Sequence, residues 1–429
     1  MLTGKEKRWW KGGWFRPIWS LVAALSLLAM VIAPALADDT IILTNGKMYT
    51  GTILSETDEF VEFDTKISNI PTRMKIERED IRSIVRDHRG WNGTNDKPDE
   101  TPGQIEENGS GVRVMEIPLV GTFGQDILPI GFQGSLDYAR RNKIKHIVLR
   151  IDSPGGQVWA ARSILQMIEA NRSQFEFQAL IEHSISAAIW PTFACDTIHM
   201  APRGEFGGAV AFRQSSLGNV EVDAKMNSIL AAEIVTIAES LGHDGDVVRA
   251  MMLMESELYA QTSGRRVILK GFRDAGSSEQ GEQIDGPTTV LTLTTKEAVR
   301  LGVAKPLRSA SLDALFQALG FEEWNEIKGG AGVMERWTGQ CEKRRKLAES
   351  SAIRLLDYYQ QAEETEDIDE AIDALVGFQR EHPRFAKYYS ELMECFPTDE
   401  SIDAEDVQEM TRKVRALIKE LRRIKREGP

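Results

Sequence analysis

The feature that most constrains this chain is a strand, a tight turn and a helix in direct succession, "KHIVLRIDSPGGQVWAARSILQMIEAN" at residues 145–171. The run "HIVLRI" is typical of a buried strand, and the apolar residues after the turn recur at helical spacing. Pro154 fixes its φ angle, while Gly155 and Gly156 can adopt backbone conformations that other residues avoid. Such a turn can point backbone N–H groups outward at a helix start, where an oxyanion is held, or it can be a plain turn without a ligand.

The chain is long enough for more than one domain. Its 429 residues exceed what one hydrophobic core usually organises, so we expect two or three domains. The pattern predicts five parts: a signal peptide (1–37), a small β-barrel domain (38–90), a linker (91–110), an α/β domain (111–310) and a helical region (311–429). The predicted barrel contains five short β-rich runs, with Asn45-Gly46 as a hairpin signal, and resembles an SH3-like or Sm-like barrel at the level of pattern.

The N-terminus has the pattern of an export signal. Five Lys and Arg residues lie among residues 1–16, an apolar run follows, and Ala35-Leu36-Ala37 closes it. A basic segment, a short apolar segment and a small-residue site predict cleavage before Asp38 and a periplasmic or cell-envelope location. The alternative is an uncleaved anchor helix, because residues 17–33 have about the shortest length that spans a bilayer.

Charge, cysteines and histidines exclude several classes of protein. The formal net charge is −13 and the middle of the chain has no basic stripe, so nucleic acid is not an expected partner. Cys195, Cys341 and Cys395 are too sparse for a disulfide framework, and Cys195 lies in an apolar context typical of a core residue. The six histidines are scattered without metal-ligand spacing. We therefore expect no metal and no cofactor.

Three motifs in order resemble the signal peptide peptidase A and NfeD-type membrane-associated serine peptidases of the Clp/crotonase superfamily. They are "IVLRIDSPGG", then "ISAAIWPTFACDTIHMAP", then "VLTLTTKEAVRLGVAK" at residues 290–305. The resemblance spans about residues 112–310 and implies an α/β fold with a Clp/crotonase-like core of ββα repeats. It does not cover the barrel before this domain or the helical region after it.

The resemblance indicates which serine is the nucleophile. In this family the serine precedes small residues and lies ten residues before the aspartate at the start of the next strand. Counting back from Asp196 leads to Ser186, which two alanines follow. Ser184 is out of register, and Ser153 belongs to the glycine turn. The alternative is that Ser186 is a small hydroxyl packed in a tight helical turn.

A serine hydroxyl needs a base to act as a nucleophile, and in this family a lysine at a helix start supplies it. Lys225 lies 39 positions after Ser186. A lysine that acts as a base near pH 7 needs its pKa lowered by about three units, which apolar burial and the positive end of a helix favour. His183, three residues before Ser186, is the alternative base. The residues predicted to form an apolar face on the helix of Lys225 are Met226, Ile229, Leu230, Ile234 and Ile237.

The function implied by the resemblance is an exported serine endopeptidase with a Ser186–Lys225 dyad. The N–H groups of Gly156 and Ala187, with Gly155, would hold the oxyanion. The implied substrates are membrane-protein segments or signal peptides, cut in a cleft that a homo-oligomer completes. The alternative is a catalytically inactive scaffold or binding protein at the cell envelope that keeps the fold.

Two segments depart from the family pattern, and a third lies beyond it. Ala188 stands where glycine is common, residues 189–191 ("IWP") are bulkier than usual, and residues 270–288 read as a polar insertion. The family's substrate size and cleft shape are therefore not carried over to this chain, and the departures also fit an inactive member that keeps the fold. Residues 411–429 carry eight Lys and Arg against two Glu, with an apolar stripe. This helix is expected either to contact an anionic membrane surface or to pack its stripe on the helical bundle.

Overall fold

The computed structural model describes residues 39–43, 48–57, 60–67, 70–78, 81–85, 111–209, 220–263, 266–271, 281–396 and 404–427. The chain divides into two compact units, Asp38–Thr338 and Met1–Ala37 with Gly339–Pro429. The predicted signal peptide and linker lie outside the described residues. None of the described helices combines the length and the apolar composition that a bilayer crossing requires.

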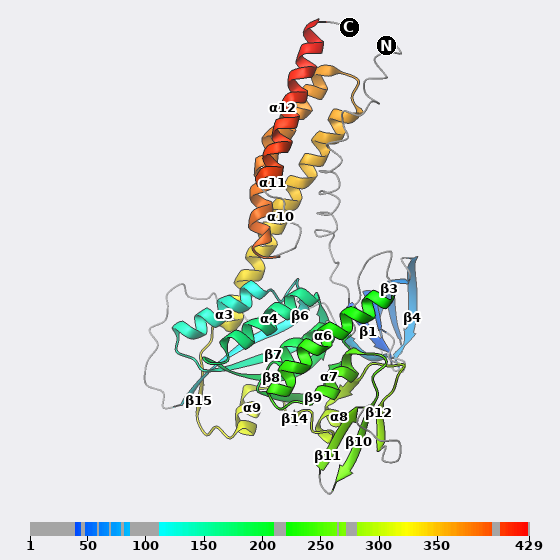
Figure 1. Cartoon of the computed structure of the whole chain (residues 1–429), viewed down its shortest axis with the longest axis vertical. Helices are drawn as coiled ribbons and strands as arrows, with labels where there is room; N and C mark the ends of the chain where they lie inside the picture. The colour runs from blue at the N-terminus through cyan, green and yellow to red at the C-terminus, as the bar shows by residue number, and fades with distance from the viewer. Residues whose placement is uncertain are drawn as a thin grey trace. The chain divides into compact units, whose positions relative to one another are not determined.

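The centre of the first unit is a sheet whose main strands are parallel (Figure 1). The strands β6 (Val112–Phe123), β7 (His146–Gly156), β8 (Glu176–Ile185) and β9 (Thr197–Gly207) pair in parallel, in this order. Three short strands add to the edges: β13 (Thr292–Thr294), β14 (Lys305–Pro306) and β15 (Trp324–Glu326). The predicted strand "HIVLRI" is β7, in the interior of this sheet, and the predicted α/β class is confirmed.

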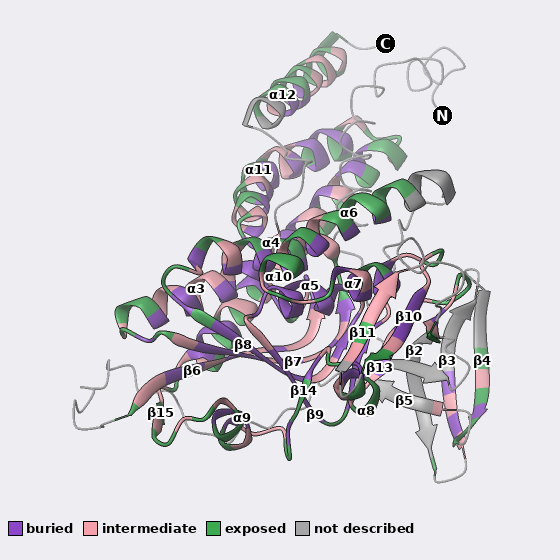
Figure 2. Ribbon diagram, turned by 60° about the horizontal axis from the view of Figure 1, so that its bottom comes forward, coloured by how far each residue is buried: buried purple, intermediate pink, exposed green. Residues whose placement is uncertain are grey.

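Both faces of the sheet are covered, which explains the continuous apolar runs of its strands. On one face, Ile147, Leu149 and Ile151 pack with α3 (Pro129–Arg141) and α4 (Val158–Asn171). On the other, Val148 packs with α9 (Leu312–Leu319). Figure 2 shows the buried residues concentrated where these helices meet the sheet. On α4 the predicted apolar face is the buried one: Ala161, Ile164, Leu165 and Ile168.

Further helices and a small sheet complete this α/β domain. The short elements η3 (Ser186–Ala188) and α5 (Ile189–Phe193) join β8 to β9. The helices α6 (Val220–Ser240) and α7 (Gly245–Met252) precede an antiparallel sheet of β10 (Leu258–Ser263), β11 (Arg266–Gly271) and β12 (Glu282–Asp285). The helix α8 (Thr295–Arg300) begins with a capping box between Thr294 and Glu297.

The α/β domain continues beyond residue 310, where the sequence predicted its end. Leu315 and Phe316 of α9 are fully buried against the sheet, and β15 extends the sheet by pairing with β6. Trp324 of β15 lies beside Val112 of β6, more than 200 residues earlier in the chain. A pairing over this separation leaves no local mark in the sequence, whereas the amphipathic pattern of α9 alone reads as the start of a helical region.

The N-terminal strands form an antiparallel sheet. Its order is β4 (Ile70–Glu77), β3 (Phe60–Ile67), β2 (Met48–Glu56), β1 (Asp39–Leu43) and β5 (Ile81–Val85). Val61, Phe63 and Ile76 form its core. The five predicted strands are present, and β1 pairs antiparallel with β2 on either side of the predicted Asn45-Gly46 turn, which lies outside the described residues. Among the described strands β4 and β5 are not paired, so closure into an SH3-like or Sm-like barrel is not confirmed.

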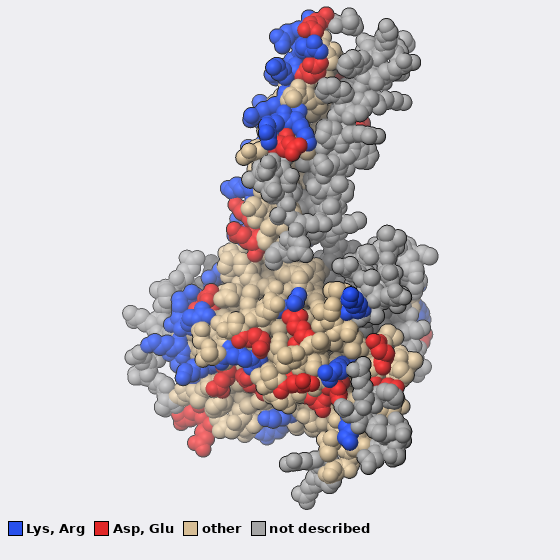
Figure 3. Space-filling view, viewed as in Figure 1, with Lys and Arg blue, Asp and Glu red and all other residues tan. Residues whose placement is uncertain are grey.

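The helical unit is built on α10 (Gly330–Glu364), α11 (Ile368–Met393) and α12 (Ala404–Glu427). Its core joins Leu355 of α10, Phe378 and Phe385 of α11, and Val414 and Ile418 of α12. The apolar stripe of α12 therefore packs on the other helices, as one of the two sequence hypotheses expected. The opposite side of α12 carries Lys and Arg side chains, which gather along it in Figure 3.

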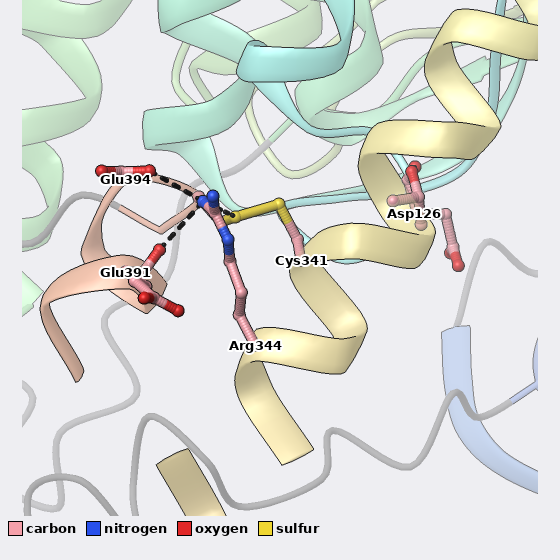
Figure 4. Close-up of a disulfide and its surroundings, with 7 residues drawn as sticks. Asp126, Cys341, Arg344, Glu391 and Glu394 are labelled. Carbon is pink, nitrogen blue, oxygen red and sulfur yellow. Dashed lines mark hydrogen bonds and ion pairs between the residues drawn. A yellow bond between two sulfur atoms is a disulfide. The ribbon is translucent and has the colours of Figure 1, made fainter. Parts of the chain in front are cut away.

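A disulfide joins Cys341 of α10 to Cys395, which follows α11 (Figure 4). Beside it, the Arg344 guanidinium donates hydrogen bonds to the Glu391 carbonyl and the Glu394 carboxylate. The sequence did not predict this pair, because cysteines 54 residues apart carry no local signal. Cys195 is buried and free, as expected of a core residue. Disulfides persist mainly in oxidising compartments.

Candidate active site

Ser186 stands at a sharp transition from strand to helix. It follows the last residue of β8 and opens η3, and its φ angle is +54°. An L residue rarely adopts a positive φ, and such strain is retained mainly where the surrounding structure holds a residue for function. The turn presents the Ser186 side chain at the end of the parallel strands, where α/β proteins commonly place their sites.

The three serines near the glycine turn differ in access. Ser153 and Ser184 are fully buried. The Ser153 hydroxyl accepts a hydrogen bond from the Gly155 N–H at 3.1 Å, and the Ser184 hydroxyl pairs with that of Thr192 at 2.8 Å. Ser186 is only partly buried, and its hydroxyl makes no hydrogen bond to any residue that the structure describes. Of the three, Ser186 has the hydroxyl that a substrate can reach.

The glycine turn lies directly against Ser186. Gly155 has a φ of +107°, and a Cβ added to it would lie 2.5 Å from the Ser186 Cβ and 3.0 Å from the Ala187 nitrogen. Gly156 has a φ of +135°, and a Cβ there would lie 2.4 Å from the Phe123 carbonyl oxygen. Only glycine fits at either position. The structure thus brings together two motifs that are about thirty residues apart in the sequence.

The donors expected for an oxyanion are not equivalent. The Gly155 N–H already donates to the Ser153 hydroxyl, so it has a partner within the turn. Gly156 and Ala187 lie on the two sides of the same junction, one at the end of β7 and one after Ser186. These two residues are therefore better candidates for an oxyanion hole than Gly155.

The bulky residues after Ser186 are packed in the core. Ile189, Trp190 and Pro191 are buried, and Trp190 is among the largest fully packed side chains of the domain. These side chains therefore pack α5 against the core of the domain.

Lys225 lies near the start of α6 and is exposed. Later turns of this helix are fixed to the domain: Leu230 and Ile234 are buried in the main core, and Arg162 of α4 forms an ion pair with Glu233 at 2.9 Å. Lys225 makes no hydrogen bond or ion pair with the described residues. The structure places it on the correct domain and does not bring it into contact with Ser186.

The apolar face predicted for α6 is only half buried. Leu230 and Ile234 face the core as expected, whereas Met226 is 39% exposed and Ile229 is 54% exposed. Both exposed side chains lie within a turn or so of Lys225, which makes the start of α6 an apolar surface with one amine on it.

His183 has a partner that the sequence did not indicate. Its Nδ1 lies 2.7 Å from the Asp152 carboxylate, and the strand register places Asp152, His183 and Glu205 side by side on β7, β8 and β9. The hydrogen bond that His183 donates to the Asp152 carboxylate raises the pKa of His183 above its ordinary value, against the opposing effect of burial. A raised pKa keeps the imidazole protonated nearer to neutral pH and so makes it a poorer proton acceptor there. The hydrogen bond to Asp152 is the one that orients the histidine in Ser–His–Asp sites, so His183 remains the second candidate base, although the described residues show no hydrogen bond between His183 and Ser186.

His199 is a buried histidine outside this cluster. It lies on β9, is fully buried, and its Nε2 has no hydrogen-bond partner among the described residues. Burial, with a smaller effect from Lys305, lowers the pKa of His199 to about 4. The native protein therefore holds this imidazole neutral at pH values where the unfolded chain is protonated.

We expect His199 to make the protein less stable in acid. The pKa of His199 in the folded protein lies below the ordinary value of 6.5. The contribution of the neutral imidazole to the free energy of unfolding is therefore complete above about pH 6.5 and is lost as the pH falls toward 4. Urea unfolding measures the drop in the free energy of unfolding between about pH 7 and about pH 4.5. This drop should be smaller for His199→Leu than for the wild type, by up to about 3 kcal/mol. Equal losses in the two proteins would mean that His199 is not held neutral.

Comparison with known proteins supports the resemblance over part of the chain. Residues 113–271 match the family model described as NfeD1b, N-terminal domain. Similar solved structures include the 1510-N membrane protease specific for a stomatin homolog from Pyrococcus horikoshii, with 15% identity, 53% of this chain and 98% of that chain covered, and a TM-score of 0.33.

Two further solved structures are also similar to this chain. A 1510-N membrane-bound stomatin-specific protease in complex with a substrate peptide has 15% identity, covers 52% of this chain and 94% of its own, and gives a TM-score of 0.37. A ClpP1 from Listeria monocytogenes has 15% identity, covers 47% of this chain and 94% of its own, and gives a TM-score of 0.30. No curated protein matches the chain in sequence.

Proposed function

We propose that the α/β domain is a serine endopeptidase in which Ser186 is the nucleophile and Lys225 the base. One observation carries the proposal: of the three serines near the Gly155-Gly156 turn, Ser186 has the accessible hydroxyl, and it lies at a positive φ directly against this turn. The match of residues 113–271 to the NfeD1b N-terminal domain covers this whole arrangement. Lys225 is proposed from the motif resemblance and from its place at the start of α6.

The proposed reaction proceeds through an acyl-enzyme. The Ser186 Oγ attacks the scissile carbonyl carbon while its proton passes to the neutral Lys225 amine. The N–H groups of Gly156 and Ala187 stabilise the oxyanion of the tetrahedral intermediate, and each such donor contributes about 10²–10³ in rate. The C–N bond then breaks, and Lys225 returns the proton to the leaving amine. Water, activated by the same amine, hydrolyses the acyl-enzyme and restores Ser186.

An exposed lysine must be shielded from water to act as a base near neutral pH. Taking an amine out of water disfavours its charged form, so a surface that closes over the start of α6 would promote the neutral amine. Met226 and Ile229 give this surface an apolar character that suits such a contact. We assign the cover to a second copy of the chain, which is also how the cleft of a homo-oligomer would be completed.

The proposed substrates are membrane-protein segments or signal peptides at the cell envelope. The N-terminal pattern of basic, apolar and small residues and the Cys341–Cys395 disulfide both support an exported protein. Whether residues 1–37 are removed or remain as an anchor, the α/β domain would work close to the membrane that the chain has crossed.

The proposal is tested by labelling the purified protein with a fluorophosphonate and mapping the adduct by peptide mass spectrometry. We expect a single adduct on Ser186, because Ser153 and Ser184 are buried and hydrogen-bonded. An adduct on Ser184 or Ser153 would refute the assignment of the nucleophile. A complete lack of labelling at every pH and in every oligomeric fraction would favour an inactive scaffold.

A further inference from the structure

The α12 helix carries a row of cations that no carboxylate neutralises. Arg415, Lys419, Arg422 and Arg426 are spaced at i, i+4, i+7 and i+11, which places them on one helix face. All four side chains are exposed, and none of them forms an ion pair with the residues that the structure describes. Figure 3 shows blue side chains along α12. Eight of the last nineteen residues of the chain are Lys or Arg.

Other cations of the same helix are neutralised. Lys413 pairs with Glu409 at 2.5 Å, Arg423 pairs with Glu420 at 2.6 Å, and Lys425 pairs with Asp369 of α11. Partners were thus available to α12, and the row lacks them. Like charges at i, i+4 spacing destabilise a helix, so the row carries a cost that a bound anion would relieve.

These four residues line a hollow between α12 and α11. It has a volume of about 280 Å³, with Gln379 of α11 and Ile418 of α12 completing its lining. An amide and four cations offer donors in several directions, which suits the oxygens of a phosphate group. The negative end of the helix dipole accounts for cations only in the last turn, so it does not explain Arg415 and Lys419.

The apolar side of α12 is not available to a membrane. Met410, Val414 and Ile418 are buried, and Leu417 and Leu421 pack against the same core. Insertion of this helix into acyl chains would require the bundle to open. What α12 offers is a straight row of cations on a helix face, a geometry that meets several lipid head groups at once without insertion.

We propose that the row of Arg415, Lys419, Arg422 and Arg426 and its hollow bind the phosphate head groups of anionic phospholipids. The site goes beyond the proposed peptidase and does not depend on it. With a chain of net charge −13, general attraction to an anionic surface is absent, so binding must come from this local site. It would hold the helical unit on a membrane surface by charge alone.

The test uses the full chain as purified from the cell envelope and compares its binding to phosphatidylcholine vesicles with and without phosphatidylglycerol. The ratio of the two binding constants removes any contribution of an uncleaved apolar N-terminus. A cation near an anionic surface contributes roughly fivefold in affinity, so replacing all four row residues with Gln should lower the ratio by about 100-fold or more. The variant should fold as well as the wild type, because the loss of like-charge repulsion offsets the loss of one exposed hydrogen bond, from the Arg426 guanidinium to the Arg422 carbonyl.

A matched control changes the charge equally at paired cations outside the hollow. Lys413, Arg423 and Lys425 of α12 and Lys346 of α10 are each paired with a carboxylate, and replacing all four with Gln gives the same change of net charge. We expect this control to keep the ratio within about threefold of the wild type, because paired cations attract lipids weakly. Equal losses in both variants, or a wild-type ratio near one, would overturn the proposal.

Two further arms identify another source of the anion. Inorganic phosphate could raise the Tm above its value in chloride at equal ionic strength, with the rise lost in the row variant. If the vesicle ratio of the wild type is then not above one, the hollow binds a soluble phosphate, and the lipid proposal is overturned. Binding of a polyglutamate peptide under the same conditions would assign it to an acidic protein segment and overturn it as well. If the fourfold variant does not fold, Arg415→Gln and Lys419→Gln alone should each lower the ratio about fivefold.

Discussion

Ser186→Ala is expected to lower peptide cleavage by at least about 10³-fold, since it removes the nucleophile and leaves only binding and oxyanion stabilisation. The fold should be retained. The Ser186 hydroxyl makes no hydrogen bond to the described residues, and alanine has the same Cβ at the same positive φ. We therefore expect the free energy of unfolding to change by less than about 1 kcal/mol. Single-turnover cleavage of a fluorogenic peptide library, with thermal unfolding on the same samples, measures both quantities.

The matched control is Ser184→Ala, two residues earlier, near the end of β8. The Ser184 hydroxyl is buried and pairs with Thr192, so its removal should cost about 1 kcal/mol of stability and leave turnover nearly intact. The two variants are thus expected to show opposite patterns, one in activity and the other in stability. Loss of turnover in Ser184→Ala with retention in Ser186→Ala would exchange the roles of the two serines.

The parts of this fold that were predictable have short-range signals. The strand, turn and helix around Gly155-Gly156 are each marked within a few residues, by apolar runs, helical periodicity and residues of special backbone freedom. The choice of Ser186 depended on a motif register, and the structure adds an independent reason for it in the access of its hydroxyl and its φ angle.

The parts that were missed depend on long-range pairing. Asp152 meets His183 only because a register irregularity lies between Ile151 and Asp152 as β7 pairs with β8. The Cys341–Cys395 bond and the β6–β15 pairing likewise join distant segments. Periodicity could not reveal that Met226 and Ile229 face away from the core, because it predicts a common face and not what covers it.

The identity of the base has the second large expected effect. Lys225→Arg keeps the positive charge and much of the length of the side chain, yet a guanidinium does not deprotonate at a usable pH. If Lys225 accepts the Ser186 proton, this variant should lose at least about 10³-fold in turnover, as much as Ser186→Ala. His183→Gln, which keeps a polar side chain beside Asp152, should retain most of the wild-type rate.

The pH profile of cleavage, measured on the wild type and on His183→Gln, also distinguishes the two bases. Asp152 raises the pKa of His183, so a histidine-dependent rate would rise through a pH somewhat above 6.5 and level off. A lysine-dependent rate should instead follow the deprotonation of the Lys225 amine, because the neutral amine is the active form. The profile should also be unchanged in His183→Gln, because that residue takes no part in the proton transfer.

Near wild-type cleavage by Lys225→Arg would reduce Lys225 to a surface residue. Loss of activity in a folded His183→Gln would instead assign the base to the aspartate–histidine pair, and the site would then be a Ser–His–Asp triad built from the ends of β7 and β8.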